Sequence, residues 1–154
     1  MSAFLQKSGT DGSSNVRLDD LLGYTVRRVQ IRMSPHLAEQ FHQYRLRPTQ
    51  SSAMLVVEQC PGISQVVLAR QLAVERSQIV HLLKKLGRRE LVVKTRGTQD
   101  KRTNFLQLSN DGSALVERLK IVALASDGAI CSGVSRAEKM HLHSLLLKLG
   151  GCRS

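Results

Sequence analysis

The chain has 154 residues, of which 42% are hydrophobic and 23% are charged, values that are ordinary for a globular protein with one core or two small lobes. Its charge is unusual, because 23 lysines and arginines against 12 aspartates and glutamates give a formal net charge of +11, which favours a polyanionic partner. Three widely spaced cysteines exclude a disulfide framework and a CxxC zinc site, and no run approaches the roughly 18 apolar residues of a membrane helix.

Residues 1–15 contain several glycines and serines and few apolar side chains, which predicts a flexible N-terminal tail. They lack the basic start and the continuous apolar run of a signal peptide. We therefore expect a soluble, cytoplasmic protein without a membrane partner.

Apolar residues recur at helical spacing after the tail. Between Arg17 and Tyr44 these positions are Leu18, Leu21, Leu22, Val29, Met33, Leu37 and Phe41. Pro35 lies inside this stretch, and because proline removes a helical hydrogen bond, we expect a kink or a restart there. A second helix is predicted to begin at Pro48, which suits a first helical turn, and to end at Pro61-Gly62.

A helix-turn-helix is predicted next. Ser64 is placed to cap a short helix that runs through Leu72, and a tight turn leads to a helix over residues 75–89. The apolar positions of this second helix follow i, i+3, i+4, i+7, the spacing of one buried face, and they are Ile79, Leu82, Leu83 and Leu86.

Two β-rich runs at residues 91–95 and 104–108 flank a polar turn, as the strands of a hairpin do. Two more helices are predicted after the hairpin. Their end signals are Ser109 as the cap of a helix over residues 110–131, the Ser135 and Glu138 capping box of the last helix, and Gly150-Gly151 as its stop.

The predicted fold class is mainly α with a small β wing, a winged helix-turn-helix joined to a helical dimerisation lobe. Residues 46–109 are predicted to form the DNA-binding lobe, and residues 16–45 with 110–150 the dimerisation lobe. Because the terminal helices are too short to bury their apolar faces alone, we expect a second copy of the chain to cover them in a homodimer.

The helix over residues 75–89 has the pattern of a recognition helix. Opposite its leucine stripe lie Ser77, His81, Lys84 and Arg88, with Arg76, Gln78, Val80 and Lys85 on the flanks. Polar groups near the start of such a helix suit base edges in the major groove, and cations further along suit phosphates. Arg76 can pair with guanine and Gln78 with adenine.

A solvated surface is the ordinary explanation for charges on a helix, but the charge distribution argues against it. Residues 76–102 hold nine lysines and arginines and two acids, so they carry +7 of the total +11. We therefore expect this segment to contact double-stranded DNA. The predicted DNA-binding residues are Ser64, Gln65, Arg76, Ser77, Gln78, His81, Lys84, Lys85, Arg88, Arg96, Lys101 and Arg102.

The hairpin turn extends this surface as a wing. Arg102 is placed to enter the minor groove, while Lys101 and Arg96 can meet phosphates. Asp100 is unusual in so basic a loop. It either orients an arginine through a carboxylate–guanidinium pair or forms the turn beside Gly97, and the sequence leaves both roles open.

From Leu46 to about Leu119 the chain resembles the MarR family of bacterial and archaeal transcriptional regulators. The matching segments are the helix-turn-helix of residues 46–92, the D-x-R of the wing at Asp100-Lys101-Arg102, and the Leu-Ser-x-x-Gly start of the next helix at Leu108-Ser109-Asn110-Asp111-Gly112. The resemblance implies terminal helices that intertwine in a dimer. It also implies a DNA-binding regulator, most simply a repressor on a pseudo-palindromic operator, that responds to a small and often aromatic or phenolic ligand.

The resemblance further places a ligand pocket between the dimerisation lobe and the DNA-binding lobe. The candidate ligand-binding residues are Tyr24, Arg28, Arg32 and His36. An arginine in such a pocket could bind an acidic effector. The other interpretation, which the sequence favours, is that these are dimer-interface or surface residues.

Three positions depart from the family pattern. Glu90 stands where the family usually has the glycine that ends the recognition helix in a left-handed turn, and Gly87 lies earlier. A non-glycine residue at positive φ costs about 1 kcal/mol, so we expect the helix to end early. Arg47 replaces a common threonine cap, and Ala73 replaces a common glycine in the helix-turn-helix turn.

Other function classes have weaker signals. The sequence contains no GxSxG, GxxxxGK[ST] or HExxH motif, so we expect neither an enzyme nor a cofactor. His141 and His143 diverge by about 200° on a helix, which does not suit a metal site. Cys60 fits a small buried thiol better than a redox sensor. The main alternative is a non-specific architectural nucleic-acid-binding protein, for which this chain offers few aromatic residues to stack on bases.

Overall fold

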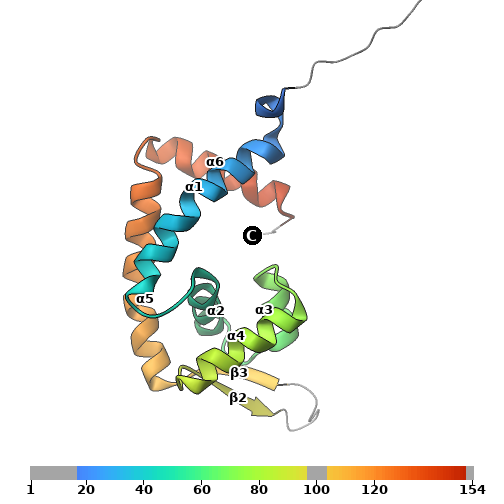
Figure 1. The fold of residues 1–154 in the computed structure, drawn as a ribbon, viewed down its shortest axis with the longest axis vertical. Coiled ribbons are helices and arrows are strands. Elements are labelled where there is room, and N and C mark those ends of the chain that lie inside the picture. The colour runs from blue at the N-terminus through green and yellow to red at the C-terminus, as the bar shows by residue number, and fades with distance from the viewer. Residues whose placement is uncertain (1–16, 97–103, 152–154) are drawn as a thin grey trace, which may run out of the picture. The chain divides into compact units, whose positions relative to one another are not determined.

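A computed structural model of the chain describes residues 17–96 and 104–151 (Figure 1). The chain divides after Arg32 into two compact units, and helix α1 spans the boundary. In chain order the elements are the 3-10 helix η1 (Leu18–Asp20), α1 (Leu22–His42), α2 (Pro48–Gln59), β1 (Ile63–Ser64), α3 (Gln65–Gln71), α4 (Arg76–Arg88), β2 (Val92–Arg96), β3 (Asn104–Leu108), α5 (Asn110–Ile130) and α6 (Arg136–Leu149).

The second unit contains a three-stranded antiparallel sheet in the order β1-β3-β2. Leu106 of the central strand lies opposite Ile63 on one side and Lys94 on the other. The strands predicted at residues 91–95 and 104–108 are confirmed to within one residue. The sequence analysis missed β1, because two residues are too few to show the alternation of a strand.

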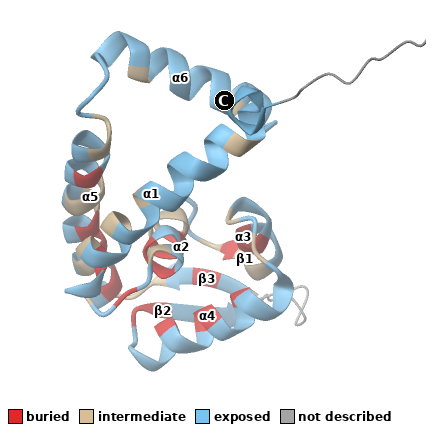
Figure 2. Cartoon of the chain, turned by 45° about the horizontal axis from the view of Figure 1, so that its top comes forward, coloured by how far each residue is buried: buried red, intermediate tan, exposed pale blue. Residues whose placement is uncertain are grey.

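One hydrophobic core lies in the second unit. Figure 2 colours its buried residues red, and most of them lie in α2, α3, α4, the sheet and the first half of α5. The predicted apolar stripe of α4 is confirmed, because all four of its side chains are buried, namely Ile79, Leu82, Leu83 and Leu86. By contrast, α6 has no buried residue. Across residues 17–96 and 104–151, every helix is too short or too polar to cross a membrane.

Serine side chains cap the N-termini of three helices, as predicted. The Oγ of Ser64 accepts the N–H of Val67 at 3.3 Å, and Ser109 caps α5 in the same way. Ser135 and Glu138 form the predicted capping box, in which Glu138 Oε2 accepts the Ser135 N–H at 2.8 Å. The hydrogen bonds from Ser135 lower the pKa of Glu138 below its ordinary value. These contacts satisfy N–H groups that a helix cannot pair internally.

A non-glycine residue with positive φ lies in the turn after each of three helices, namely Arg45 (53°) after α1, Ala73 (50°) after α3 and Glu90 (55°) after α4. After α4, the Leu91 N–H donates to the Leu86 carbonyl at 3.1 Å and the Glu90 N–H to the Gly87 carbonyl at 3.0 Å, the pattern of a Schellman motif. The expected early end of this helix is therefore wrong, since Gly87 stays helical and Glu90 takes the left-handed conformation. The physical reason is that these bonds and the burial of Leu86 and Leu91 fix the turn.

The N-terminal helical stretch begins later than its apolar spacing suggests. Residues 18–20 form a 3-10 turn, and the α-helix begins at Leu22. Helix α1 then continues through Pro35 as one element, so the chain does not restart there. Pro35 still cannot donate the usual helical hydrogen bond to the Ile31 carbonyl. The predicted flexible tail, residues 1–15, lies outside the described residues.

Candidate nucleic-acid interface

Helix α4 presents its polar side chains away from the core. The opposite face is the buried stripe of isoleucine and leucine side chains. The exposed side chains of this helix are those of Arg76, Ser77, Gln78, Val80, His81, Lys84, Lys85 and Arg88. The structure thus has the outward surface that the sequence pattern indicates for a recognition helix.

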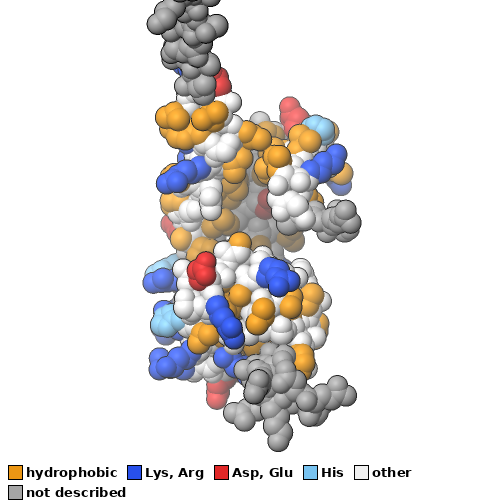
Figure 3. Space-filling view, turned by 90° about the vertical axis from the view of Figure 1, so that its right-hand side faces the viewer, with side chains coloured by type: hydrophobic (Ala, Val, Ile, Leu, Met, Phe, Trp, Pro, Cys, Tyr) orange, Lys and Arg blue, Asp and Glu red, His pale blue; other side chains and the backbone are white. Residues whose placement is uncertain are grey.

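The cations of α4 form no ion pair with an acid among the described residues. Four ion pairs occur in the part of the chain that the structure describes, and none of them involves Arg76, Lys84, Lys85 or Arg88. Figure 3 shows lysine, arginine and histidine side chains gathered along one edge of the lower part of the view. A basic surface of this kind attracts a polyanion.

A hollow of about 440 Å³ lies between the start of α2 and one flank of α4. It is lined by Arg47, Thr49, Gln50, Val74, Ser77, Gln78, His81, Leu82 and Lys85. Arg47 therefore joins His81 and Lys85 on one surface. The sequence analysis missed Arg47 as a functional candidate, because no local signal indicates that α2 begins beside α4. The sequence analysis named Arg47 only because it stands where the family commonly has a threonine cap.

Some of the predicted DNA-binding side chains already take part in helix capping. The Oε1 of Gln78 accepts the Glu75 N–H at 3.3 Å, so one lone pair of the oxygen expected to pair with adenine is engaged. Ser64 caps α3, and half-buried Gln65 is the first residue of that helix. Base contact by Ser64, Gln65 and Gln78 stays a prediction.

Arg89 does not belong to this surface, although the sequence analysis counts it in the basic segment. Its guanidinium donates to the carbonyl oxygen of Arg45 at 2.9 Å and to that of Tyr44 at 3.0 Å. These carbonyls belong to the turn that ends α1, where cationic donors are favourable. Arg89 therefore ties the end of α4 to this turn and serves the fold.

Two of the three wing residues expected to contact DNA, Lys101 and Arg102, lie outside the described residues. Asp100, expected to orient an arginine or to form the turn, also lies outside them. Arg96 ends β2, where it pairs in register with Asn104 of β3. The two strands of the hairpin are thus described, while the roles of Asp100, Lys101 and Arg102 stay predictions.

The candidate ligand-binding residues fall in both units. In the first unit, Arg28 Nη1 lies 2.8 Å from Asp19 Oδ1, and its guanidinium carbon lies 5.8 Å from the centre of the Tyr24 ring, a cation–π distance. Arg32 is exposed in the same unit, and His36 is half-buried in the second unit. Arg28 thus has an acidic and an aromatic partner of its own, and ligand binding by these residues stays a prediction.

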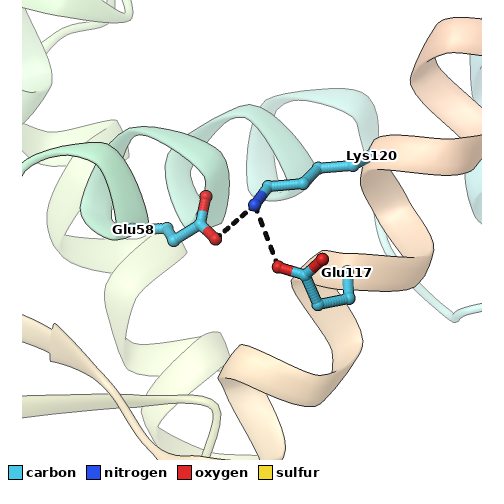
Figure 4. Close-up of polar contacts among 3 residues, drawn as sticks. All are labelled: Glu58, Glu117 and Lys120. Atoms are coloured by element: carbon cyan, nitrogen blue, oxygen red, sulfur yellow. Dashed lines mark hydrogen bonds and ion pairs between the residues drawn. The ribbon is translucent and has the colours of Figure 1, made fainter.

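A cluster of three charged side chains joins α2 to α5 within the second unit (Figure 4). Lys120 Nζ lies 2.5 Å from Glu58 Oε1 and 2.9 Å from Glu117 Oε1. The hydrogen bond to Glu58 raises the pKa of Lys120, and the hydrogen bond from Lys120 lowers the pKa of Glu117. The cluster therefore ties together the helices that precede and follow the helix-turn-helix and its hairpin.

Cys60 is exposed at the end of α2, so the expectation of a buried thiol is wrong. Val57, one turn earlier, is buried in the core. The chain leaves the helix at Cys60, with φ −129° and ψ 71°, and this carries the thiol away from the buried face.

Comparison with known proteins agrees with this arrangement. The family model of the SarA/Rot transcriptional regulators matches residues 37–119, which is more than half of the chain. A Thauera aromatica protein named as a transcriptional regulatory protein for the hcr operon is 28% identical over 129 residues. That match covers 83% of this chain and 78% of the Thauera protein.

Solved structures of regulators have the same fold. The transcriptional repressor CouR, bound to a 23-mer DNA duplex, matches with a TM-score of 0.80 and 29% identity, covering 89% of this chain and 99% of the CouR chain. CouR from Rhodococcus jostii RHA1 bound to p-coumaroyl-CoA matches with a TM-score of 0.77 and 24% identity, covering 86% and 94%. A MarR family regulator from Rhodococcus sp. RHA1 matches with a TM-score of 0.81 and 24% identity, covering 88% and 96%. The chain therefore belongs to the SarA/Rot family of transcriptional regulators, and it is a DNA-binding winged helix regulator of the MarR type.

Proposed function

We propose that the chain is a homodimeric repressor that binds a pseudo-palindromic operator and leaves it when a small ligand binds. In this proposal α4 enters the major groove, with Arg76 and Ser77 toward base edges and with Lys84 and Arg88 toward phosphates. The observation that carries the proposal is the outward face of α4, which is exposed and whose cations have no acidic partner among the described residues. The relative CouR, a repressor solved on a DNA duplex, supports it.

Apolar side chains that the single chain leaves uncovered support the homodimer. In the first unit they are Leu18, Leu21, Leu22, Val26, Val29 and Ile31. In the second unit, α6 and the later part of α5 expose Ile121, Leu124, Met140, Leu142, Leu145, Leu146 and Leu149. Apolar patches of this kind usually mark an interface, and a second copy carries the same patches. We therefore assign dimerisation to residues 16–45 and 110–150, and DNA binding to residues 46–109.

The proposed effector is a small aromatic or acidic compound. CouR supports a ligand response, because it has also been solved with p-coumaroyl-CoA. A ligand lowers the affinity for DNA only if it binds better to a conformation whose two α4 helices no longer match successive major grooves. The residues proposed to meet the ligand are Tyr24, Arg28, Arg32 and His36.

Selection of duplexes from a random DNA pool, followed by a hydroxyl-radical footprint on the selected duplex, tests the proposal. We expect protection of two half-sites about one helical turn apart. Light scattering of the free protein should give about 34 kDa, twice the 17.1 kDa of one chain. Equal protection of any duplex would favour the architectural alternative. A single 17.1 kDa chain on the operator would contradict the homodimer.

A further inference from the structure

Val80 is an exposed side chain of α4 to which the proposed function gives no role. The whole of α4 is described, and Val80 is the one exposed side chain of this helix without a polar group. Its exposed fraction is 45%, and it is not among the partly buried apolar side chains that pack against the core. Because valine is β-branched, its helix propensity is also low. Neither packing in the core nor helix propensity therefore explains why a valine stands at this position.

The position of Val80 on α4 places it among the residues proposed to read bases. It follows Ser77 by three positions and Arg76 by four, so both are its neighbours on the helix surface. Around the helix axis Val80 lies about 60° from Ser77, on the flank opposite Lys85. Recognition helices contact base edges with their N-terminal residues, and Val80 is the fifth residue of a helix of 13.

The major groove of DNA offers an apolar group that such a side chain can contact. Base edges there offer hydrogen-bond donors and acceptors, and the one apolar group is the 5-methyl group of thymine. We propose that Val80 recognises the 5-methyl group of one thymine in each half-site of the operator. This inference rests on the proposed function and extends it, because it makes Val80 a residue that determines sequence specificity.

The contact removes apolar surface of both partners from water. The expected gain is about fourfold in affinity for each half-site, the value of one buried methyl or methylene group. Two symmetric half-sites should therefore give about fifteenfold. In the proposed function Arg76 and Ser77 would recognise base edges through hydrogen bonds, so their contributions should not depend on the methyl group.

Replacement of thymine by deoxyuridine removes the methyl group and keeps every hydrogen-bonding group of the base. Each thymine of the selected operator is replaced in both half-sites together, and dissociation constants are measured by fluorescence anisotropy for wild type, Val80→Ala and Ser77→Ala. We expect one position at which wild type binds the deoxyuridine duplex about fifteenfold more weakly. Val80→Ala should lose this preference, and Ser77→Ala, a matched variant on the same face, should keep it whatever its affinity.

Equal affinity of wild type for thymine and deoxyuridine at every position would overturn the inference, as would a preference that survives in Val80→Ala. Either result would leave the proposed repressor intact, because protection of two half-sites is measured separately. Failure to select any operator would instead refute the proposed function, and the inference with it. Since Val80 is exposed and alanine has the higher helix propensity, the thermal unfolding midpoint of Val80→Ala should be no lower than that of wild type.

Discussion

The carbonyl oxygen of Leu91 occupies the space that a side chain at Gly112 would need. A Cβ atom on Gly112 would lie 2.1 Å from this oxygen. The same oxygen accepts the Ser109 N–H at 3.2 Å, while Ser109 Oγ accepts the Gly112 N–H at 2.9 Å. The Leu-Ser-x-x-Gly segment is therefore one structural unit, in which the serine begins α5 and the glycine lets α5 pass the backbone that leads into β2.

Gly112→Ala should destabilise the fold by roughly 3 kcal/mol, the upper range of overpacking, because a backbone carbonyl cannot move aside as a flexible side chain can. Urea unfolding followed by circular dichroism measures this difference. Gly128→Ala is the matched control in the same helix, since a Cβ there meets nothing within 4 Å. It should stabilise the protein by up to about 1 kcal/mol through helix propensity. Equal effects of the two substitutions would contradict the close approach of Leu91.

Glu90→Gly should stabilise the protein by about 1 kcal/mol, because glycine adopts positive φ without the penalty of a Cβ. Gly87→Ala should also stabilise it by about 1 kcal/mol, since Gly87 is inside α4 and a Cβ there makes only an ordinary contact of 3.9 Å with the Val92 carbonyl oxygen. Thermal unfolding of the two variants measures both effects. Destabilisation by Glu90→Gly would mean that the left-handed turn after α4 is not formed.

Lys120→Met should lower stability most near neutral pH. The raised pKa of Lys120 stabilises the fold below the ordinary lysine range, and this contribution is lost as the pH rises through the folded-state value. The lowered pKa of Glu117 stabilises the fold above the ordinary glutamate range, and this contribution is lost as the pH falls through the folded-state value. The difference between wild type and Lys120→Met should thus shrink toward both extremes. Urea unfolding across the pH range measures it, and a constant difference would assign the effect to the hydrocarbon stem of Lys120.

Lys84→Gln and Arg88→Gln should each weaken the salt dependence of operator binding. Each phosphate contact contributes about 0.9 to the slope of log K against log salt, so one substitution in both subunits of a dimer should reduce the slope by about 1.8. Fluorescence anisotropy titrations at several salt concentrations provide the slopes. Lys148→Gln, a change of an exposed cation on α6, is the matched control and should leave the slope unchanged. An unchanged slope in both α4 variants would exclude the proposed phosphate contacts.

The winged helix region could be predicted because its signals are local. The spacing of Ile79 and its three leucine partners defines the buried face of α4, and Ser109 and Ser135 each lie three residues before the N–H that they cap. The order of elements then leaves few architectures in which one core covers all these faces. The resemblance to the MarR family agreed with this order, and the fold class was confirmed.

The features that were missed depend on residues far apart in the sequence. Strand β1 exists because Ile63 pairs with Leu106, and the role of Arg89 depends on a carbonyl 44 positions away. Arg47 became a candidate residue of the nucleic-acid interface only when the structure placed the start of α2 beside α4. The expected early end of α4 rested on the local cost of a positive φ at Glu90. The hydrogen bonds and the burial of Leu91 outweigh that cost.

Methylation interference on the selected operator tests the placement of α4 most directly. Dimethyl sulfate methylates guanine at N7, which faces the major groove. If the outward face of α4 lies in that groove, guanine methylation in two half-sites about one turn apart should block binding. Arg76→Ala should then lose the interference at the guanine that Arg76 contacts. Binding that tolerates methylation at every guanine would contradict the major-groove placement of α4.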